Sequence, residues 1–232
     1  MKILAVIPAR GGSKRLPRKN IRNLGGLPLI GWTIESCKNI TEICGLLVST
    51  DDEIIGNSAR DMGCMFPWLR PKELSTDSAS SIDVVLHSLD WYETNYGKVD
   101  GVMMLQPTSP FRKKETIKSG IELFRTRAMR PVLGVSPVRD HPYWVFKKHK
   151  DHLKPFVRDG GLEIRSQDLP EAYIANGCLY IITPTDLRGN HSFITNDTSP
   201  LIIDSMIESL DIDTDWDWRV ASMIVESKIY EG

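Results

Sequence analysis

The sequence has few cysteines, and they are not arranged as a metal or redox motif. No two of the four form a C-x-x-C pair, which is the spacing typical of zinc sites and redox centres. A disulfide framework is also unexpected in a chain of 232 residues. We therefore interpret all four cysteines as buried free thiols. They are Cys37, Cys44, Cys64 and Cys178.

The chain also lacks a charge excess and a long apolar run. Its 29 basic and 30 acidic side chains nearly cancel, whereas broad binding to nucleic acid or to a membrane surface calls for a basic excess. The apolar run at residues 3–7 is far shorter than the roughly 20 residues of a membrane span. Pro8 and a charged segment follow it at once, which is atypical of a signal peptide. We therefore expect a cytoplasmic protein with no nucleic-acid partner and no membrane association.

Histidine-based chemistry is not indicated either. The five histidines show no H-x-x-x-H spacing, so the sequence predicts neither a histidine metal site nor a Ser-His-Asp triad.

Strand-like and helix-like segments alternate over the first 135 residues. Continuous apolar runs, typical of strands that are covered on both faces, occur at residues 3–7, 45–50, 101–106 and 132–135. Apolar residues at helical spacing predict helices at residues 29–40, 53–62, 80–96 and 113–127. This alternation predicts an α/β fold with a doubly wound sheet and right-handed crossovers.

The alternation stops after Val135. Residues 139–170 combine scattered aromatic side chains with a basic run, and they predict an inserted hairpin or small subdomain. Strand-like runs return at residues 177–182 and 200–203, and a final helix is predicted over residues 215–227.

The segment after the first predicted strand is rich in glycine and in cations. Ligands of open α/β sheets bind outside the carboxyl ends of the strands. Gly11 and Gly12 free the backbone to approach a ligand, and exposed N–H groups can cradle phosphate oxygens. The surrounding cations are Arg10, Lys14, Arg15, Arg18 and Lys19. The pattern predicts a polyphosphate site that is neither a Walker A loop nor G-x-G-x-x-G; a basic surface loop is the alternative.

Two carboxylates, Asp211 and Asp213, precede the last predicted helix. At positions i and i+2 of a strand they project to one side, while Ile212 faces the core. Mg²⁺ suits such carboxylates beside phosphate oxygens, because it also keeps several waters. We expect this pair and the cationic segment to meet across one crevice. The alternative is that Asp213, Thr214 or Asp215 only caps the helix.

Polar residues also follow the other predicted strands. The segment Ser49–Asp52 is interpreted mainly as a helix cap. Hydroxyl groups between Arg70 and Ser81 could read a base edge or only cap the next helix. Gln106 would point from the tip of the third strand into the site, unless Gln106–Pro110 is only a rigid turn.

These motifs together resemble the acylneuraminate cytidylyltransferases, the CMP–sialic acid synthetases. The matching segments keep their order and are residues 7–20 (I-P-A-R-G-G-S-K-R-L-P-R-K-N), 48–51 (V-S-T-D), 69–74 (L-R-P-x-E-L), 79–81 (A-S-S), 105–110 (L-Q-P-T-S-P), 176–177 (N-G) and 210–214 (L-D-I-D-T). The Lys19-Asn20 ending of the first segment separates the chain from the related KDO cytidylyltransferases.

The resemblance implies a fold and a reaction. The fold would be a Rossmann-like, mostly parallel mixed sheet flanked by helices, with one domain over residues 1–232 and a dimerisation and sugar-pocket subdomain inserted at 139–175. The reaction would be a Mg²⁺-dependent transfer of CMP from CTP to a nine-carbon 2-keto sugar acid, with release of pyrophosphate. The enzyme would be a homodimer.

The resemblance also implies roles for individual residues. The catalytic residues would be Arg10, Lys19, Asp211 and Asp213, of which Asp211 and Asp213 would hold Mg²⁺. The nucleotide-binding residues would be Ala9, Arg10, Gly11, Ser13, Lys19, Asn20, Arg70 and Ser81. The sugar-binding residues would be Gln106, Asn176, Tyr180 and Phe193, with Phe193 reaching a pocket that could belong to the partner subunit.

Two positions depart from the pattern of the family. Ser166 and Ile174 stand where many relatives carry cations, so we expect legionaminic and pseudaminic acids as acceptors on an equal footing with N-acetylneuraminic acid. Two other hypotheses stay open. One is a nucleotidyltransferase for a different sugar acid or a sugar phosphate, and the other is a nucleotide-binding module without turnover. The paired carboxylates favour an enzyme, because binding alone does not require them.

Overall fold

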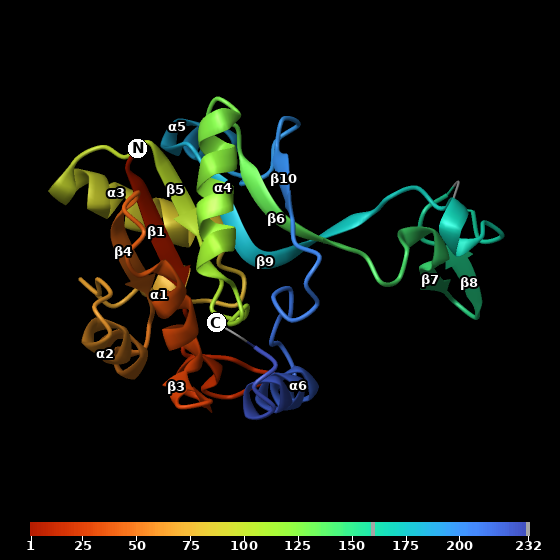
Figure 1. The fold of residues 1–232 in the computed structure, drawn as a ribbon, viewed down its shortest axis with the longest axis horizontal. Coiled ribbons are helices and arrows are strands. Elements are labelled where there is room, and N and C mark those ends of the chain that lie inside the picture. Colours follow the sequence, from red (N-terminus) through yellow and green to blue (C-terminus); the bar gives the residue numbers. More distant parts are fainter. Residues whose placement is uncertain (159–160, 231–232) are drawn as a thin grey trace.

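The computed structural model describes residues 1–158 and 161–230, and within them a six-stranded sheet lies between helices (Figure 1). The strand order is β10-β6-β9-β5-β1-β4. The strands are β1 (Ile3–Pro8), β4 (Ile43–Ser49), β5 (Gly101–Met104), β6 (Val132–Pro137), β9 (Tyr173–Ile182) and β10 (Ser199–Ile202). Strand β1 pairs in parallel with β4 and β5, and β6 pairs in parallel with β10, whereas β9 is antiparallel to β5 and β6. The mostly parallel mixed sheet that the resemblance implies is confirmed.

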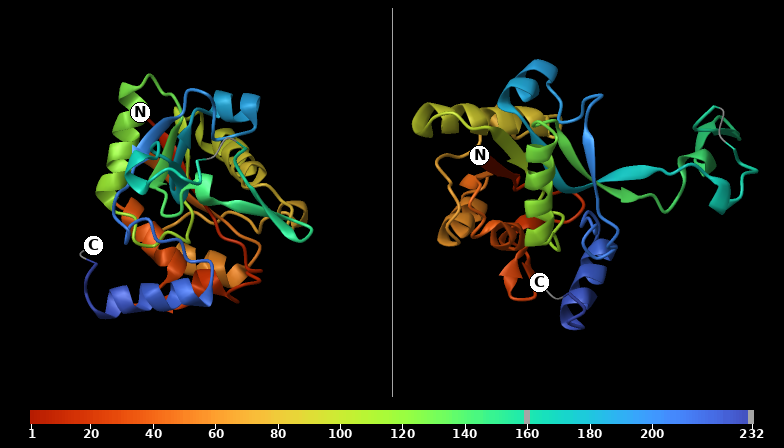
Figure 2. Two further views of the ribbon diagram at one scale, coloured as in Figure 1. Left: turned by 90° about the vertical axis from the view of Figure 1, so that its right-hand side faces the viewer. Right: turned by 45° about the horizontal axis from the view of Figure 1, so that its top comes forward.

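Helices cover both faces of this sheet. They are α1 (Leu29–Cys37), α2 (Glu53–Asp61), α3 (Ser81–Tyr96), α4 (Lys114–Thr126) and α5 (Pro184–Asn190), whereas α6 (Asp215–Glu226) packs beside β2 (Asn23–Leu24) and the start of α1. Side chains of β1 alternate between the faces: Ile3, Ala5 and Ile7 pack with α1, α2 and α4, while Leu4 and Val6 pack with α3 and α5. Figure 2 shows α3 and α4 on opposite sides of the sheet. Strand β1 is buried on both faces, so the prediction of a covered strand from its continuous apolar run is confirmed.

Side-chain caps explain where several helices begin. The Asp52 carboxylate accepts hydrogen bonds from the amides of Ile54 and Ile55 at the start of α2. Thr214 caps α6 in a capping box with Asp217. The capping alternative therefore holds for Asp52 and Thr214, and Asp213 does not cap the last helix.

A small two-stranded sheet projects away from the main sheet between β6 and β9 (Figure 1). It consists of β7 (Phe146–His149) and β8 (His152–Pro155), which pair antiparallel and form the predicted hairpin. Residues 159–160 of the predicted subdomain and residues 231–232 of the predicted domain lie outside the described residues. A second short pair, β2 (Asn23–Leu24) with β3 (Leu27–Pro28), follows the cationic segment.

Two features differ from the expectation. Cys44 is exposed, because it lies near the start of the edge strand β4, where the pairing with β1 shifts register, and so the prediction of a buried thiol is wrong at this position. Cys37, Cys64 and Cys178 are buried, as predicted. Helix α5 was not anticipated from the sequence.

Among the described helices, none is both long enough and apolar enough to cross a membrane.

Candidate active site

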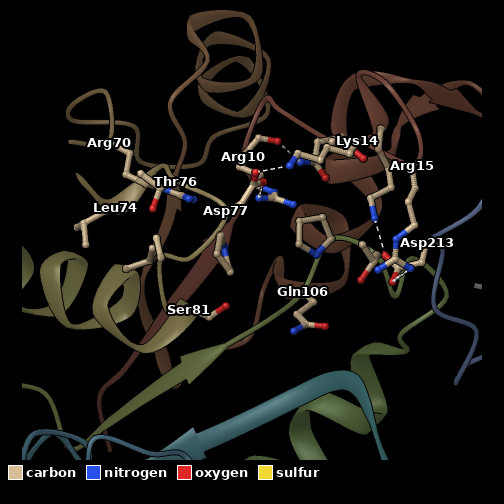
Figure 3. Close-up of a pocket in the computed structure, with 18 of the residues that line it drawn as sticks. Arg10, Lys14, Arg15, Arg70, Leu74, Thr76, Asp77, Ser81, Gln106 and Asp213 are labelled. Atoms are coloured by element: carbon tan, nitrogen blue, oxygen red, sulfur yellow. Dashed lines mark hydrogen bonds and ion pairs between the residues drawn. The ribbon is translucent and has the colours of Figure 1, made fainter. Parts of the chain in front are cut away.

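A crevice of about 580 Å³ opens at the edge where β1 and β5 end (Figure 3). Its walls come from the cationic segment after β1, from residues 70–84, from the loop after β5 and from the segment before α6. This is the edge at which ligands of open α/β sheets bind. The residues named from the sequence that line it are Arg10, Ser13, Lys14, Arg15, Lys19, Asn20, Arg70, Ser81, Gln106, Asp211 and Asp213.

The cationic segment and the acidic pair meet in this crevice. Lys19 Nζ lies 2.9 Å from Asp213 Oδ1 and donates to the carbonyl oxygen of Ile212 at 2.8 Å. Arg15 forms a second ion pair with Asp213, at 3.3 Å. Ile212 is fully buried, and its amide donates to the carbonyl oxygen of Thr108 at 2.8 Å, so the segment is anchored between two carboxylates that face the crevice. The predicted convergence is confirmed, although the segment is an extended loop rather than a strand.

The backbone of the cationic segment is held by short contacts. The amide of Gly11 donates to Asp51 Oδ1 at 2.8 Å, and a Cβ atom at Gly11 would lie 2.9 Å from Asp52. Asn20 donates through its amide nitrogen to the carbonyl oxygen of Arg10 at 2.9 Å. Ala9 is fully buried. Ala9 and Gly11 thus shape the loop from behind, and the structure does not bring their side-chain positions into the crevice wall.

Arg70 forms a fixed part of the opposite wall. It is 7% exposed, and its guanidinium donates to Ser49 Oγ at 3.1 Å and to the carbonyl oxygen of Ser49. Burial lowers the pKa of Arg70 to about 10, with the charge of Asp51 acting in the opposite direction. Arg70 remains a cation at neutral pH, and its position is set by the end of β4. Ser81, the first residue of α3, lines the same wall.

The residues assigned to the sugar are less closely grouped. Gln106 lines the crevice. Asn176 is buried, and its amide is used internally: it donates to Ser136 Oγ at 2.9 Å and accepts from the amide of Cys178 at 3.1 Å. Tyr180 packs edge-on against Phe193, with ring centroids 5.7 Å apart.

Tyr180 and Phe193 differ in their relation to the crevice. Burial raises the pKa of Tyr180, and the negative charge of Asp211 adds to this shift, but Tyr180 is not among the residues that line the crevice. Phe193 belongs to the apolar cluster of Leu4 and Val6 and is 5% exposed. The structure therefore brings Phe193 neither to the crevice nor to a surface from which it could reach a partner subunit.

Asp77 also faces the crevice, and the sequence did not single it out as a site residue. Its carboxylate pairs with Arg10 at 2.8 Å and with Lys14 at 2.5 Å. The hydrogen bond and charge of Lys14, followed by those of Arg10, lower the pKa of Asp77. Figure 3 shows this carboxylate between the two cations. The Asp77 carboxylate therefore occupies the positive charges of Arg10 and Lys14, to which a polyphosphate would bind.

Replacing Asp77 with asparagine is expected to strengthen pyrophosphate binding. The neutral amide no longer competes for Arg10 and Lys14, and exposed pairs of this kind correspond to about two- to fivefold in affinity. Isothermal titration with pyrophosphate measures the change. Asp90→Asn is the matched control, because it removes the same charge from an exposed ion pair with Arg188. Equal affinities in the two variants would contradict a specific role for Asp77.

The residues present fit a magnesium ion. Asp211 opens onto the crevice, where desolvation raises its pKa; a hydrogen bond with Thr108 opposes this shift and the charge of Asp213 adds to it. A cation between the two carboxylates would offset both the desolvation of Asp211 and its repulsion by Asp213. Within residues 1–158 and 161–230 no group of three or more His, Cys, Asp or Glu could hold a metal ion. Two carboxylates completed by substrate phosphates and water are what Mg²⁺ commonly uses.

A cationic loop at the carboxyl end of a strand, facing a carboxylate pair, is typical of a site for a polyphosphate and a divalent cation. The model of a family described as "Cytidylyltransferase" matches residues 4–155. The CMP-N,N'-diacetyllegionaminic acid synthase of Legionella pneumophila subsp. pneumophila is 40% identical over 228 residues, which cover 97% of each chain. The pseudaminic acid cytidylyltransferase of Campylobacter jejuni subsp. jejuni serotype O:2 is 34% identical over 183 residues, 79% of each.

A solved structure shares the fold. The CMP:2-keto-3-deoxy-manno-octonic acid synthetase complexed with CTP matches with a TM-score of 0.71 and 16% identity, over 98% of this chain and all of that one. The chain belongs to the cytidylyltransferase family and is an enzyme of the nucleotidyltransferase class. The hypothesis of a nucleotide-binding module without turnover is therefore set aside.

Proposed function

We propose that the enzyme transfers CMP from CTP to a nine-carbon 2-keto sugar acid of the legionaminic type and releases pyrophosphate. The observation that carries this proposal is the meeting of Lys19 with Asp213 in a crevice that also presents Arg10 and Arg70. The name of the Legionella relative supports the sugar class. Ile174 supports it as well, because an exposed apolar residue stands where many N-acylneuraminate enzymes carry a cation.

The proposed reaction is a single displacement. The anomeric hydroxyl of the sugar acid attacks the α-phosphorus of CTP, the bond to the β-phosphate oxygen breaks, and the hydroxyl proton is lost to a base. Arg10 and Lys19 offset the negative charge that develops on the leaving pyrophosphate. Arg70 and Ser81 hold the nucleotide at the opposite wall, and Gln106 orients the acceptor, so much of the rate comes from alignment.

We propose Mg²⁺ as the cofactor, held by Asp211 and Asp213. When bound, it supplies charge neutralisation at the phosphates and lowers the pKa of the attacking hydroxyl. Asp213 is paired with Lys19 and Arg15, so in this proposal a bound nucleotide would draw these two cations to its phosphates and leave the carboxylate for the ion.

A pyrophosphate-release assay tests the proposed function. The enzyme is mixed with Mg²⁺, one of four nucleoside triphosphates and one of three acceptors: N,N'-diacetyllegionaminic, pseudaminic or N-acetylneuraminic acid. We expect turnover with CTP and the highest kcat/KM with the legionaminic acid. A preference for pseudaminic acid, the substrate in the name of the Campylobacter relative, would correct the sugar. Absence of turnover with all three acids would contradict the proposal and favour a different sugar acid or a sugar phosphate.

We also propose that the enzyme is a cytoplasmic homodimer with the β7–β8 hairpin at the subunit contact. The hairpin and its flanks expose large apolar side chains that water would otherwise surround. They are Trp144, Val145, Phe146, Leu153 and Phe156. A second copy of the chain is the partner that would cover them, and light scattering of the purified enzyme measures its mass directly.

A further inference from the structure

Arg112 is a fully buried arginine that the proposed mechanism does not use. It lies in the loop after β5, which also contains Gln106, and it is 1% exposed. A buried guanidinium is costly unless its N–H groups are satisfied. The groups that satisfy it therefore show what the side chain holds in place.

The guanidinium joins the loop after β5 to the turn at residues 176–178 and to helix α1. Its Nη2 donates to the carbonyl oxygen of Gln106 at 2.8 Å and to that of Gly177 at 3.4 Å. Its Nε donates to the carbonyl oxygen of Cys178, and its Nη1 to Thr33 Oγ1 at 3.3 Å. Because the guanidinium is planar and its donors are fixed relative to one another, it sets the spacing between these carbonyls.

Gln106 rests directly on the turn that Arg112 holds. Gly177 has φ +75°, and a Cβ atom there would lie 2.6 Å from Gln106 Oε1. The amide of Gln106 also donates to the carbonyl oxygen of Gly177 at 3.4 Å, and Ser109 Oγ donates to that of Asn176 at 3.1 Å. The direction of the Gln106 side chain therefore depends on how closely the turn approaches the loop after β5.

The nucleotide side of the crevice is built separately. Arg10 pairs with Asp77, Lys19 with Asp213, and Arg70 with Ser49. In Figure 3 the Gln106 side chain stands apart from the group of Arg10, Lys14 and Asp77. Within the described residues, Arg112 hydrogen-bonds to Gln106 and to none of these groups.

We propose that Arg112 is a positioning residue for the sugar acid. It holds the loop after β5 against the Asn176-Gly177 turn. The side-chain amide of Gln106 is thereby fixed where the acceptor binds. This inference rests on the proposed function, in which Gln106 contacts the sugar acid. A small misplacement of such a group is costly to the rate, because the attacking hydroxyl must be aligned with the α-phosphorus.

Arg112→Lys tests this role in the full-length enzyme. Lysine keeps the charge and loses the planar fork that bridges the carbonyls. We expect the KM for the sugar acid to rise on the order of tenfold, the change that one charge-assisted hydrogen bond gives. The dissociation constant of CTP, measured by titration without acceptor, should change less than about twofold. Arg125→Lys is the matched control, because it makes the same replacement in an exposed ion pair on α4.

A double-mutant cycle with Gln106→Ala separates positioning from stability. If Arg112 acts through Gln106, Arg112→Lys has little further effect on the acceptor KM once Gln106 is alanine. An effect of full size in that background would overturn the proposal, as would equal weakening of CTP and acceptor.

Thr33→Val gives a milder variant should Arg112→Lys fail to fold. It removes the hydroxyl partner of Nη1 at nearly constant volume, and we expect a rise of a few-fold in the acceptor KM alone. An unchanged acceptor KM in every variant that folds would overturn the positioning role. Absence of wild-type turnover with all three acids would instead overturn the proposed function on which it rests.

Discussion

Replacing Lys19 with alanine is expected to lower kcat by about 10²–10³-fold, the usual effect of removing one preorganised charged donor. Lys19 is 9% exposed, and its Nζ is fixed between the carbonyl oxygen of Ile212 and Asp213. This places the charge between the acidic pair and the phosphate-binding loop, where the leaving pyrophosphate would gather its negative charge. Steady-state pyrophosphate release with saturating CTP measures the change.

Lys14→Ala is the matched control for Lys19→Ala. Lys14 belongs to the same loop, but its side chain is 77% exposed, and its one ion pair within residues 1–158 and 161–230 is with Asp77. Its loss should weaken CTP binding with a much smaller change in kcat. A wild-type kcat in Lys19→Ala, with thermal unfolding showing both variants folded, would remove Lys19 from the mechanism.

Replacing Asp211 with asparagine is expected to have an effect of similar size. The substitution keeps the shape of the side chain and removes one of the two carboxylates that would hold Mg²⁺. We expect kcat to fall by about 10²–10³-fold and the Mg²⁺ concentration needed for half-maximal rate to rise. Titration of Mn²⁺ in the presence of CTP gives a second readout that does not depend on turnover.

Asp215→Asn provides the comparison for the Asp211 variant. Asp215 lies on the first turn of α6 and pairs with Arg219 and Arg22, away from the crevice. It should leave both kcat and Mn²⁺ binding nearly unchanged. Retention of normal Mn²⁺ affinity in Asp211→Asn would show that the acidic pair is not the metal site.

Local patterns in the sequence were sufficient for the parallel part of the fold. The apolar run of β1, the glycines and cations after it, and the capped helices are all readable within a few residues. The direction of β9 could not be predicted in the same way, because an apolar run does not indicate whether a strand pairs in parallel or antiparallel. Its insertion between β5 and β6 follows from the projecting hairpin, which returns the chain without a crossover helix. Helix α5 was missed because it has only seven residues, although Thr183 and Pro184 are a recognisable start.

The candidate site was predictable where a motif joined residues that act together. The cationic loop and the acidic pair were recognisable because each combines like charges within a few positions. Asp77 and Arg112 could not be recognised in this way, because Arg10, which pairs with Asp77, and Cys178, which accepts from Arg112, lie 67 and 66 residues away from them in the sequence. Asn176 shows the opposite limit: its motif marked a site, but its side-chain amide holds the turn together rather than facing the crevice.

The most direct measurement is a crystal structure of the enzyme with a non-hydrolysable CTP analogue and Mn²⁺, located by its anomalous signal. We expect the ion between Asp211, Asp213 and the α-phosphate, the β- and γ-phosphates on Arg10 and Lys19, and Asp77 released from Arg10. A triphosphate or metal ion bound away from these groups, with Lys19 still paired to Asp213, would contradict the crevice as the catalytic site.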